Sequence, residues 1–269
     1  MTQHLDRPGG PLAYDVAGDG PLVVLAPGMG DLRGVFRDVV GPLRAAGHRV
    51  ATVDLPGHGD SGTGFTAHGV PAIAEHLAAL VEHLGAPAAL VGHSVSAGAA
   101  ALVAAERPEL VSSLVLLDPH LPPDDGGRAP LAARLMTQAI RRPLGAPLWV
   151  SYYRSLYRGR RPDWLPEHVG AIRAAMRGAH LVAFGRLARA LVTAPTPLPL
   201  DRVAAPTLVA HGALDPEFAD PAAELERALA ALPPGAKGLL VPDAGHYPHA
   251  QRPDVVVPAL LAHLAPSRA

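Results

Sequence analysis

One stretch, residues 88–98, constrains the fold of this chain more than any other. A short run of small aliphatic residues ends in Gly92-His93-Ser94, and very small residues continue directly after the serine. This pattern predicts a buried strand that turns sharply into a helix, because only short side chains fit where the two backbones nearly touch. The spacing is Gly-x-Ser-x-Ser, so Ser96 departs from the usual Gly-x-Ser-x-Gly. The pattern is typical of a nucleophile elbow, a turn that presents a reactive serine, here Ser94. The alternative is an ordinary strand-turn-helix that happens to contain a serine.

Strand and helix patterns alternate over most of the 269 residues. Apolar residues recur at helical spacing from Ile73 to Leu84, where Gly85 ends the helix, and Asp31 is placed to cap an earlier helix. Short apolar runs predict strands at 12–16, 21–26, 49–54, 88–91, 114–118, 207–211 and 237–241. The alternation predicts an α/β fold: one mostly parallel, twisted sheet flanked by helices on both faces.

Residues 119–200 interrupt this alternation. Segments rich in Pro, Gly and Asp open and close the region, and helical patterns alone lie between them, at about 130–142, 147–157, 165–177 and 180–193. An all-helical insertion between two parallel strands must lie outside the sheet, near the carboxyl ends of the strands, where α/β proteins form their clefts. We therefore expect a core of residues 1–118 and 201–269, with a helical lid at 119–200.

Two polar residues follow late strands and could assist Ser94. A serine hydroxyl is a weak nucleophile that needs a base, and the base needs an acid to orient it. Asp215 comes just after one predicted strand and His246 just after the last one, in the order serine, acid, histidine. Asp118 also follows a strand and is the less favoured candidate for the acid.

The chain resembles the α/β-hydrolase superfamily over essentially its whole length. The resemblance rests on the elbow at Ser94, on Gly245-His246-Tyr247-Pro248, and on the loop Asp54-Leu55-Pro56-Gly57-His58-Gly59-Asp60-Ser61. It implies the α/β-hydrolase fold, with Ser94, Asp215 and His246 as catalytic triad. The elbow variant is also similar to bacterial stress-signalling hydrolases and to plant butenolide-hormone receptors.

The resemblance further implies an oxyanion hole and an activity. The backbone N–H groups of Met29 and Val95 correspond to the hydrogen-bond donors of the family's oxyanion hole. This chain has Pro27-Gly28-Met29 at the first of these positions, where relatives often have His-Gly-x. The implied activity is a cofactor-free serine hydrolase that cleaves a carboxylic ester, lactone or related acyl compound through an acyl-enzyme. Two alternatives stay open: a hydrolase-fold ligand receptor with slow turnover, and a lyase or cyclase that uses the same triad for proton transfer.

The charge of the chain is unevenly distributed. The net charge is −1, but residues 119–200 contain twelve arginines and four acidic residues, so this region carries +8 and the remainder −9. A solvated helix surface over an acidic core would explain the asymmetry. Alternatively, the Arg158-Gly159-Arg160-Arg161 turn faces an anionic substrate group or an acidic carrier partner. A pI near 6.9 offers no domain-wide basic face, which argues against nucleic acid binding.

Composition excludes some classes of site. The chain has no cysteine, so disulfides and thiolate ligands are absent, and the histidines show no metal-ligand spacing. No apolar run is long enough to cross a bilayer, and the N-terminus lacks an apolar signal core, so we predict a cytoplasmic protein that binds no metal and no membrane. The oligomeric state is left open.

Several aromatic and histidine side chains are secondary candidates. Trp149, Tyr152, Tyr153 and Tyr157 fall at helical spacing, which favours packing of the insertion. The alternative is that Trp149, Tyr153 and Tyr157 line the substrate pocket. His93 is predicted to be a packing residue of the turn, and His249 a surface residue.

Overall fold

The computed structural model describes residues 1–121 and 145–265, and within these ranges eight strands form one sheet. The strands are β1 (Gln3–Arg7), β2 (Gly10–Ala17), β3 (Leu22–Ala26), β4 (Arg49–Val53), β5 (Ala88–His93), β6 (Val111–Leu117), β7 (Thr207–Gly212) and β8 (Lys237–Val241). Their order is β1-β2-β4-β3-β5-β6-β7-β8. The β1–β2 and β2–β4 pairs are antiparallel and all the others parallel, so the predicted mostly parallel sheet is confirmed.

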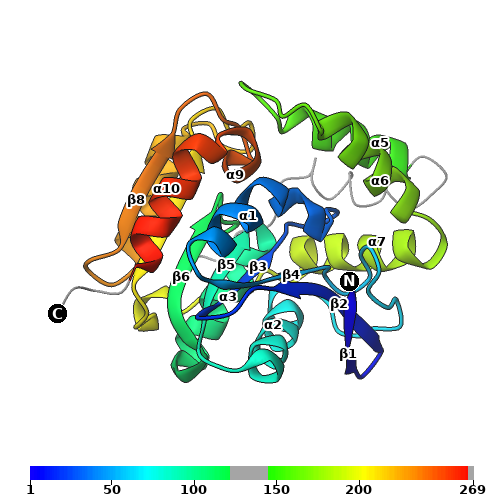
Figure 1. The fold of residues 1–269 in the computed structure, drawn as a ribbon. Coiled ribbons are helices and arrows are strands. Elements are labelled where there is room, and N and C mark those ends of the chain that lie inside the picture. Colours follow the sequence, from blue (N-terminus) through cyan, green and yellow to red (C-terminus); the bar gives the residue numbers. More distant parts are fainter. Residues whose placement is uncertain (122–144, 266–269) are drawn as a thin grey trace.

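Helices cover both faces of the sheet (Figure 1). One face packs against α2 (Val70–Leu84), α3 (Val95–Glu106) and α8 (Pro221–Ala231); the other packs against α1 (Arg37–Ala45), α9 (Pro248–Gln251) and α10 (Pro253–Leu264). Short 3₁₀ helices lie at Arg33–Phe36, Pro108–Leu110 and Leu200–Arg202. In β3, the side chain of Val24 packs in the hydrophobic core beneath α2, α3 and α8, while Val23 and Leu25 pack in the core beneath α1, α9 and α10. Burial of both faces is why this strand reads as a continuous apolar run.

The helical insertion, defined here as α5 (Gly145–Ser155), α6 (Leu165–Ala175) and α7 (Gly178–Thr193), lies between β6 and β7 in the chain. Its helices correspond to three of the four predicted ones; the fourth, at 130–142, falls outside the described residues. Figure 1 shows the three helices grouped at one side of the sheet. The action of this insertion as a lid stays a prediction.

One local expectation differs from the structure. Asp31 caps no helix, because the chain continues through Leu32 into a 3₁₀ turn before α1 starts at Arg37. The closing helix α10 starts at Pro253 and contains Pro258. Among the described residues, no helix combines the length and the apolar character that crossing a membrane requires.

Candidate active site

Ser94 lies on a strained turn between β5 and α3. Its backbone has φ 53° and ψ −120°, a conformation that non-glycine residues rarely adopt. Three main-chain hydrogen bonds hold it there. Ser94 N–H donates to the carbonyl of Leu117 at 2.9 Å, and the carbonyl of Ser94 accepts from Ala97 N–H at 3.0 Å and from His120 N–H at 3.1 Å. A Cβ on Gly92 would lie 2.3 Å from the Ser96 carbonyl oxygen, so the turn requires glycine at 92. Strain of this kind is found at functional sites.

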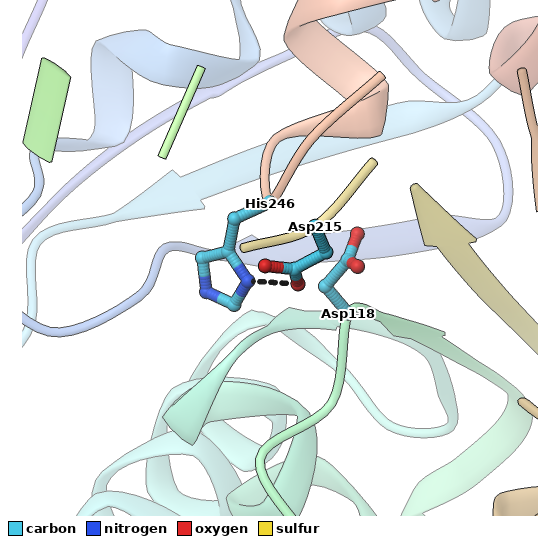
Figure 2. A group of neighbouring side chains, drawn as sticks. All are labelled: Asp118, Asp215 and His246. Carbon is cyan, nitrogen blue, oxygen red and sulfur yellow. Dashed lines mark hydrogen bonds and ion pairs between the residues drawn. The ribbon is translucent and has the colours of Figure 1, made fainter. Parts of the chain in front are cut away.

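His246 and Asp215 form a buried pair beside this turn. Asp215 follows β7 and His246 follows β8, and the distance from His246 Nδ1 to Asp215 Oδ2 is 2.7 Å (Figure 2). Asp118, at the end of β6, lies next to the pair, but its carboxylate accepts a 3.0 Å hydrogen bond from Gly212 N–H. The structure therefore brings both candidate acids to one histidine, and it is Asp215 that contacts the ring.

The three groups shift one another's pKa values. Burial raises the pKa of Asp118 to about 7. Burial also disfavours the charged forms of Asp215 and His246, but the attraction between the carboxylate and the imidazolium outweighs this effect of burial. The pKa of Asp215 is lowered, and the carboxylates of Glu217, Asp215 and Asp118 raise the pKa of His246 to about 10.

The same three residues offer ligand atoms within 4.8 Å of one another. A metal would need the nitrogen and oxygen lone pairs to point at a common centre. The 2.7 Å contact between Nδ1 and the carboxylate instead requires a proton between these two atoms. The arrangement thus fits an oriented imidazole better than a metal site.

The other ring nitrogen of His246 faces a residue that the sequence analysis missed. His246 Nε2 lies 3.2 Å from Glu217 Oε2, and the Tyr152 hydroxyl donates to the other oxygen of that carboxylate. In the part of the chain that the structure describes, no hydrogen bond joins the Ser94 hydroxyl to His246. The only sequence signal for Glu217 is an acid two residues after Asp215.

His93 holds the histidine loop against the serine turn. Its Nε2 lies 2.7 Å from the carbonyl oxygen of His246, and since a carbonyl only accepts, Nε2 carries the proton. The His93 ring packs among those of His246, Tyr247 and His249, at centroid distances of 4.6–4.9 Å. Ser94 and His246, 152 positions apart in the sequence, are therefore held in neighbouring loops.

The loop after β3 lies against the serine. A Cβ on Gly28 would lie 3.2 Å from the Ser94 Cβ, and the Ser96 hydroxyl donates to the carbonyl of Pro27 at 2.5 Å. Met29 is the next residue of this loop, and Val95 is the first residue of α3. Amides in the first turn of a helix have no partner within that helix. Both predicted oxyanion donors thus belong to segments that flank Ser94.

The loop from Asp54 to Ser61 supports the loop after β3. Gly30 N–H donates to His58 Nε2 at 2.9 Å, and His58 Nδ1 lies 3.0 Å from the Pro56 carbonyl. Nδ1 therefore carries the proton and Nε2 is the acceptor. Ser61 bonds the Asp54 carbonyl at 2.8 Å and closes the loop. The motif therefore has a positioning role.

The aromatic candidates of α5 and of the turn that follows it tie the helical insertion to the core. The Trp149 indole donates to the Gly30 carbonyl at 2.9 Å. The Tyr153 hydroxyl lies 3.2 Å from Asp31 Oδ2 and 3.1 Å from the Tyr157 hydroxyl, and all three aromatic side chains are buried. These contacts favour packing over substrate binding for Tyr153 and Tyr157.

Asp31 also bonds His168 of α6, with 2.6 Å between Oδ1 and Nε2. This buried carboxylate therefore joins two helices of the insertion to the loop after β3. The sequence analysis predicted a helix-capping role for Asp31. It could not show the contact with α6, because the partner residue lies 137 positions away.

Two further expectations concern surface residues. His249 is fully buried and stacks on Phe36 at 4.8 Å, so its predicted surface position is wrong; the short helix α9 turns the ring inward.

In the arginine-rich turn, Arg160 N–H donates to the Asp243 carbonyl at 3.0 Å, and its guanidinium lies 3.7 Å from Asp254. The turn is therefore fixed beside the loop that carries His246.

Most of the chain matches a known protein family. The model described as the Alpha/beta hydrolase family matches residues 23–259. The chain belongs to this family. A thermophilic esterase from Thermogutta terrifontis has a similar structure, with a TM-score of 0.80, 26% identity and coverage of 98% of both chains. This likeness in fold agrees with the family match.

The first curated relatives match this chain over only part of their own length. Polyketide synthase ThaQ of Burkholderia thailandensis is 31% identical over 98% of this chain, which is 13% of the synthase. The sn-1-specific diacylglycerol lipase of Mus musculus is 35% identical over 40% of this chain and 36% of the lipase. The chain spans less than two fifths of the first curated relatives that it matches.

Proposed function

We propose that this protein is a serine hydrolase that cleaves a carboxylic ester, lactone or related acyl compound through an acyl-enzyme. The observation that carries the proposal is the 2.7 Å contact between His246 and Asp215 in loops beside the strained Ser94. An esterase among the structural neighbours and a lipase among the relatives support an acyl substrate.

The chemistry follows from the roles of the three side chains. Ser94 Oγ attacks the acyl carbon while its proton passes to His246 Nε2, and Asp215 stabilises the resulting imidazolium through Nδ1. The leaving group then takes the proton from Nε2. A water molecule reaches the acyl carbon in the same way, gives its proton to Nε2, and releases the acid product with Ser94 restored.

Negative charge develops on the acyl oxygen during each attack. The N–H groups of Met29 and Val95 are the proposed donors to this oxygen. Support comes from the contact of Gly28 with Ser94 and from the Ser96–Pro27 hydrogen bond, which hold the two segments together. One such donor typically contributes about 10² to 10³ in rate.

We also propose that the helical insertion acts as a lid that shapes the substrate site. Trp149 supports this role, since its indole bonds the Gly30 carbonyl next to Met29. The arginine-rich turn would favour an anionic substrate group or an acidic carrier, and the likeness to a segment of a polyketide synthase is a reason to include thioesters among the test substrates.

Labelling with a fluorophosphonate tests the nucleophile. We expect the wild type to be labelled and Ser94→Ala to be unlabelled, with Ser155→Ala, an exposed serine of α5, labelled like the wild type. A panel of esters, lactones and thioesters then identifies the substrate class, and mass spectrometry detects the acyl adduct on Ser94. No label on the wild type, together with a ligand-dependent thermal shift, would favour a receptor; turnover without an adduct would favour a lyase or cyclase.

A further inference from the structure

Glu217 joins the helical insertion to the catalytic histidine. One carboxylate oxygen accepts a hydrogen bond from the Tyr152 hydroxyl on α5, and the other lies 3.2 Å from His246 Nε2. Glu217 N–H also donates to Asp215 Oδ1 at 2.9 Å. One short segment after β7 thus places a carboxylate at each nitrogen of the same imidazole.

The contact at Nε2 favours a protonated ring. A carboxylate only accepts hydrogen bonds, so Nε2 carries a proton where it faces Glu217. Nδ1 also carries a proton, because it faces Asp215. The ring is then an imidazolium, and Nε2 has no lone pair with which to take the proton of Ser94.

We propose that Glu217 is a positioning residue that holds His246 in a protonated resting state, with Tyr152 keeping its carboxylate in place. This inference rests on the proposed serine hydrolase function. Base catalysis begins when the Glu217 carboxylate leaves Nε2 and the Nε2 proton passes to solvent. Nε2 is then free to accept the proton of Ser94.

The exposure of the two carboxylates supports this division of roles. The Glu217 side chain is 31% exposed, so it can turn towards water, whereas the Asp215 side chain is fully buried. Tyr152 is half-buried on α5, so a displacement of α5 would release Glu217. The groups that face or surround His246 are Asp118, Asp215, Glu217, His93, His120, Tyr247 and His249. Of these, Glu217 alone contacts Nε2.

The pH profile of kcat/KM for an activated ester tests the proposal. In Glu217→Gln the acidic limb should move to lower pH by about one unit or more, since an opposite charge at this distance shifts a pKa by about 1 to 3 units. The rate on that limb then rises by about tenfold. The matched control is Glu226→Gln, an exposed glutamate of α8, which should leave the limb in place.

The contribution of Tyr152 is tested by a double-mutant comparison. Tyr152→Phe should move the limb in the same direction by a smaller amount, and it should add nothing in the Glu217→Gln background. An acidic limb that stays in place in folded Glu217→Gln, with or without a change in the plateau, would overturn the proposal.

A second readout does not depend on turnover. Histidine-specific isotope labelling allows the His246 ring to be titrated by NMR in Ser94→Ala, with and without Glu217→Gln. The titration should move to lower pH when Glu217 is replaced, and an unchanged titration would overturn the proposal. Because no substrate is needed, a failure of the serine hydrolase function is distinguishable from a failure of this inference.

Discussion

The hydroxyl of Ser96 donates a 2.5 Å hydrogen bond to the main-chain carbonyl of Pro27. It connects the first turn of α3 to the loop after β3, the two segments that carry the proposed oxyanion donors. Ser96 is fully buried, so its hydroxyl depends on this partner. A glycine at this position, as in the usual elbow motif, would leave the loop without that bond.

Ser96→Ala should therefore lower kcat by about tenfold, less than the loss of a whole oxyanion donor, because the loop of Met29 is loosened but not removed. KM should change little, since the hydroxyl does not face the substrate. Steady-state kinetics and thermal unfolding of this variant, beside Ser155→Ala, check the effect. An unchanged kcat in a folded Ser96→Ala variant would contradict it.

Asp215 and Asp118 should respond differently to loss of charge. Asp215→Asn removes the acceptor at His246 Nδ1 and should reduce kcat by about 10³- to 10⁴-fold. In Asp118→Asn the amide oxygen can still accept the Gly212 N–H, so activity should stay within about tenfold of the wild type. Kinetics of the two variants with one ester decide between them, and the opposite order would identify Asp118 as the catalytic acid.

The sequence predicted the sheet well because its central strands are buried on both faces. Their apolar runs matched β3, β4, β5 and β7 to within two residues at each end. The edge strand β8 was also predicted to within two residues, although most of its residues are exposed. The edge strand β1 was missed, since its residues Gln3–Arg7 are largely polar and exposed. Helix α8 was missed as well; only Leu225 and Ala228 of this helix are buried, which leaves a weak periodic signal.

The residues of the candidate site that belong to local motifs were predictable from the sequence. Those that are defined by contacts between distant positions were not. Ser94, Asp215 and His246 each lie in the segment that follows a parallel strand, so their positions follow from the topology. Asp31 gives no such signal, because its partners lie on α5 and α6, more than 120 positions away. Glu217 was missed for a related reason: its partner Tyr152 belongs to the insertion, whose placement over the core the sequence does not encode locally.

The raised pKa of His246 has a consequence for stability. Because the folded-state pKa of about 10 lies above the ordinary value of 6.5, the charged ring stabilises the fold fully below pH 6.5 and loses this contribution as the pH rises towards 10. The difference in free energy of unfolding between wild type and His246→Gln should shrink over this range, by up to about 1.4 kcal/mol per pH unit.

Urea unfolding at pH 6 and pH 9.5 measures this change. The control is His4→Gln, an exposed histidine of β1, whose difference from the wild type should stay constant. If the His246→Gln difference were equally constant, the histidine would not be charged in the folded protein at neutral pH.

The arginine-rich turn gives a prediction about substrate charge. Reversing Arg160 and Arg161 to glutamate should reduce kcat/KM for anionic esters several-fold more than for neutral esters of equal reactivity, and the excess should fall with added salt. Because Arg160 also pairs with Asp254, thermal unfolding must show that the variant is folded. Equal losses for the two ester classes would leave the turn with a structural role alone.

Gly30 lies where the helical insertion contacts the loop after β3, which carries the proposed oxyanion donor Met29. Its φ is +71°, and an added Cβ would lie 2.4 Å from the Trp149 indole. Gly30→Ala should therefore destabilise the protein by about 2 to 4 kcal/mol, from backbone strain and overpacking, and should lower kcat as the neighbouring Met29 moves. In Gly185→Ala the added methyl meets open space within α7, so this control should be stabilised by about 0.5 to 1 kcal/mol with unchanged kcat. Urea unfolding and steady-state kinetics of the pair measure both effects, and equal stability of the two variants would show that Trp149 does not press on the loop.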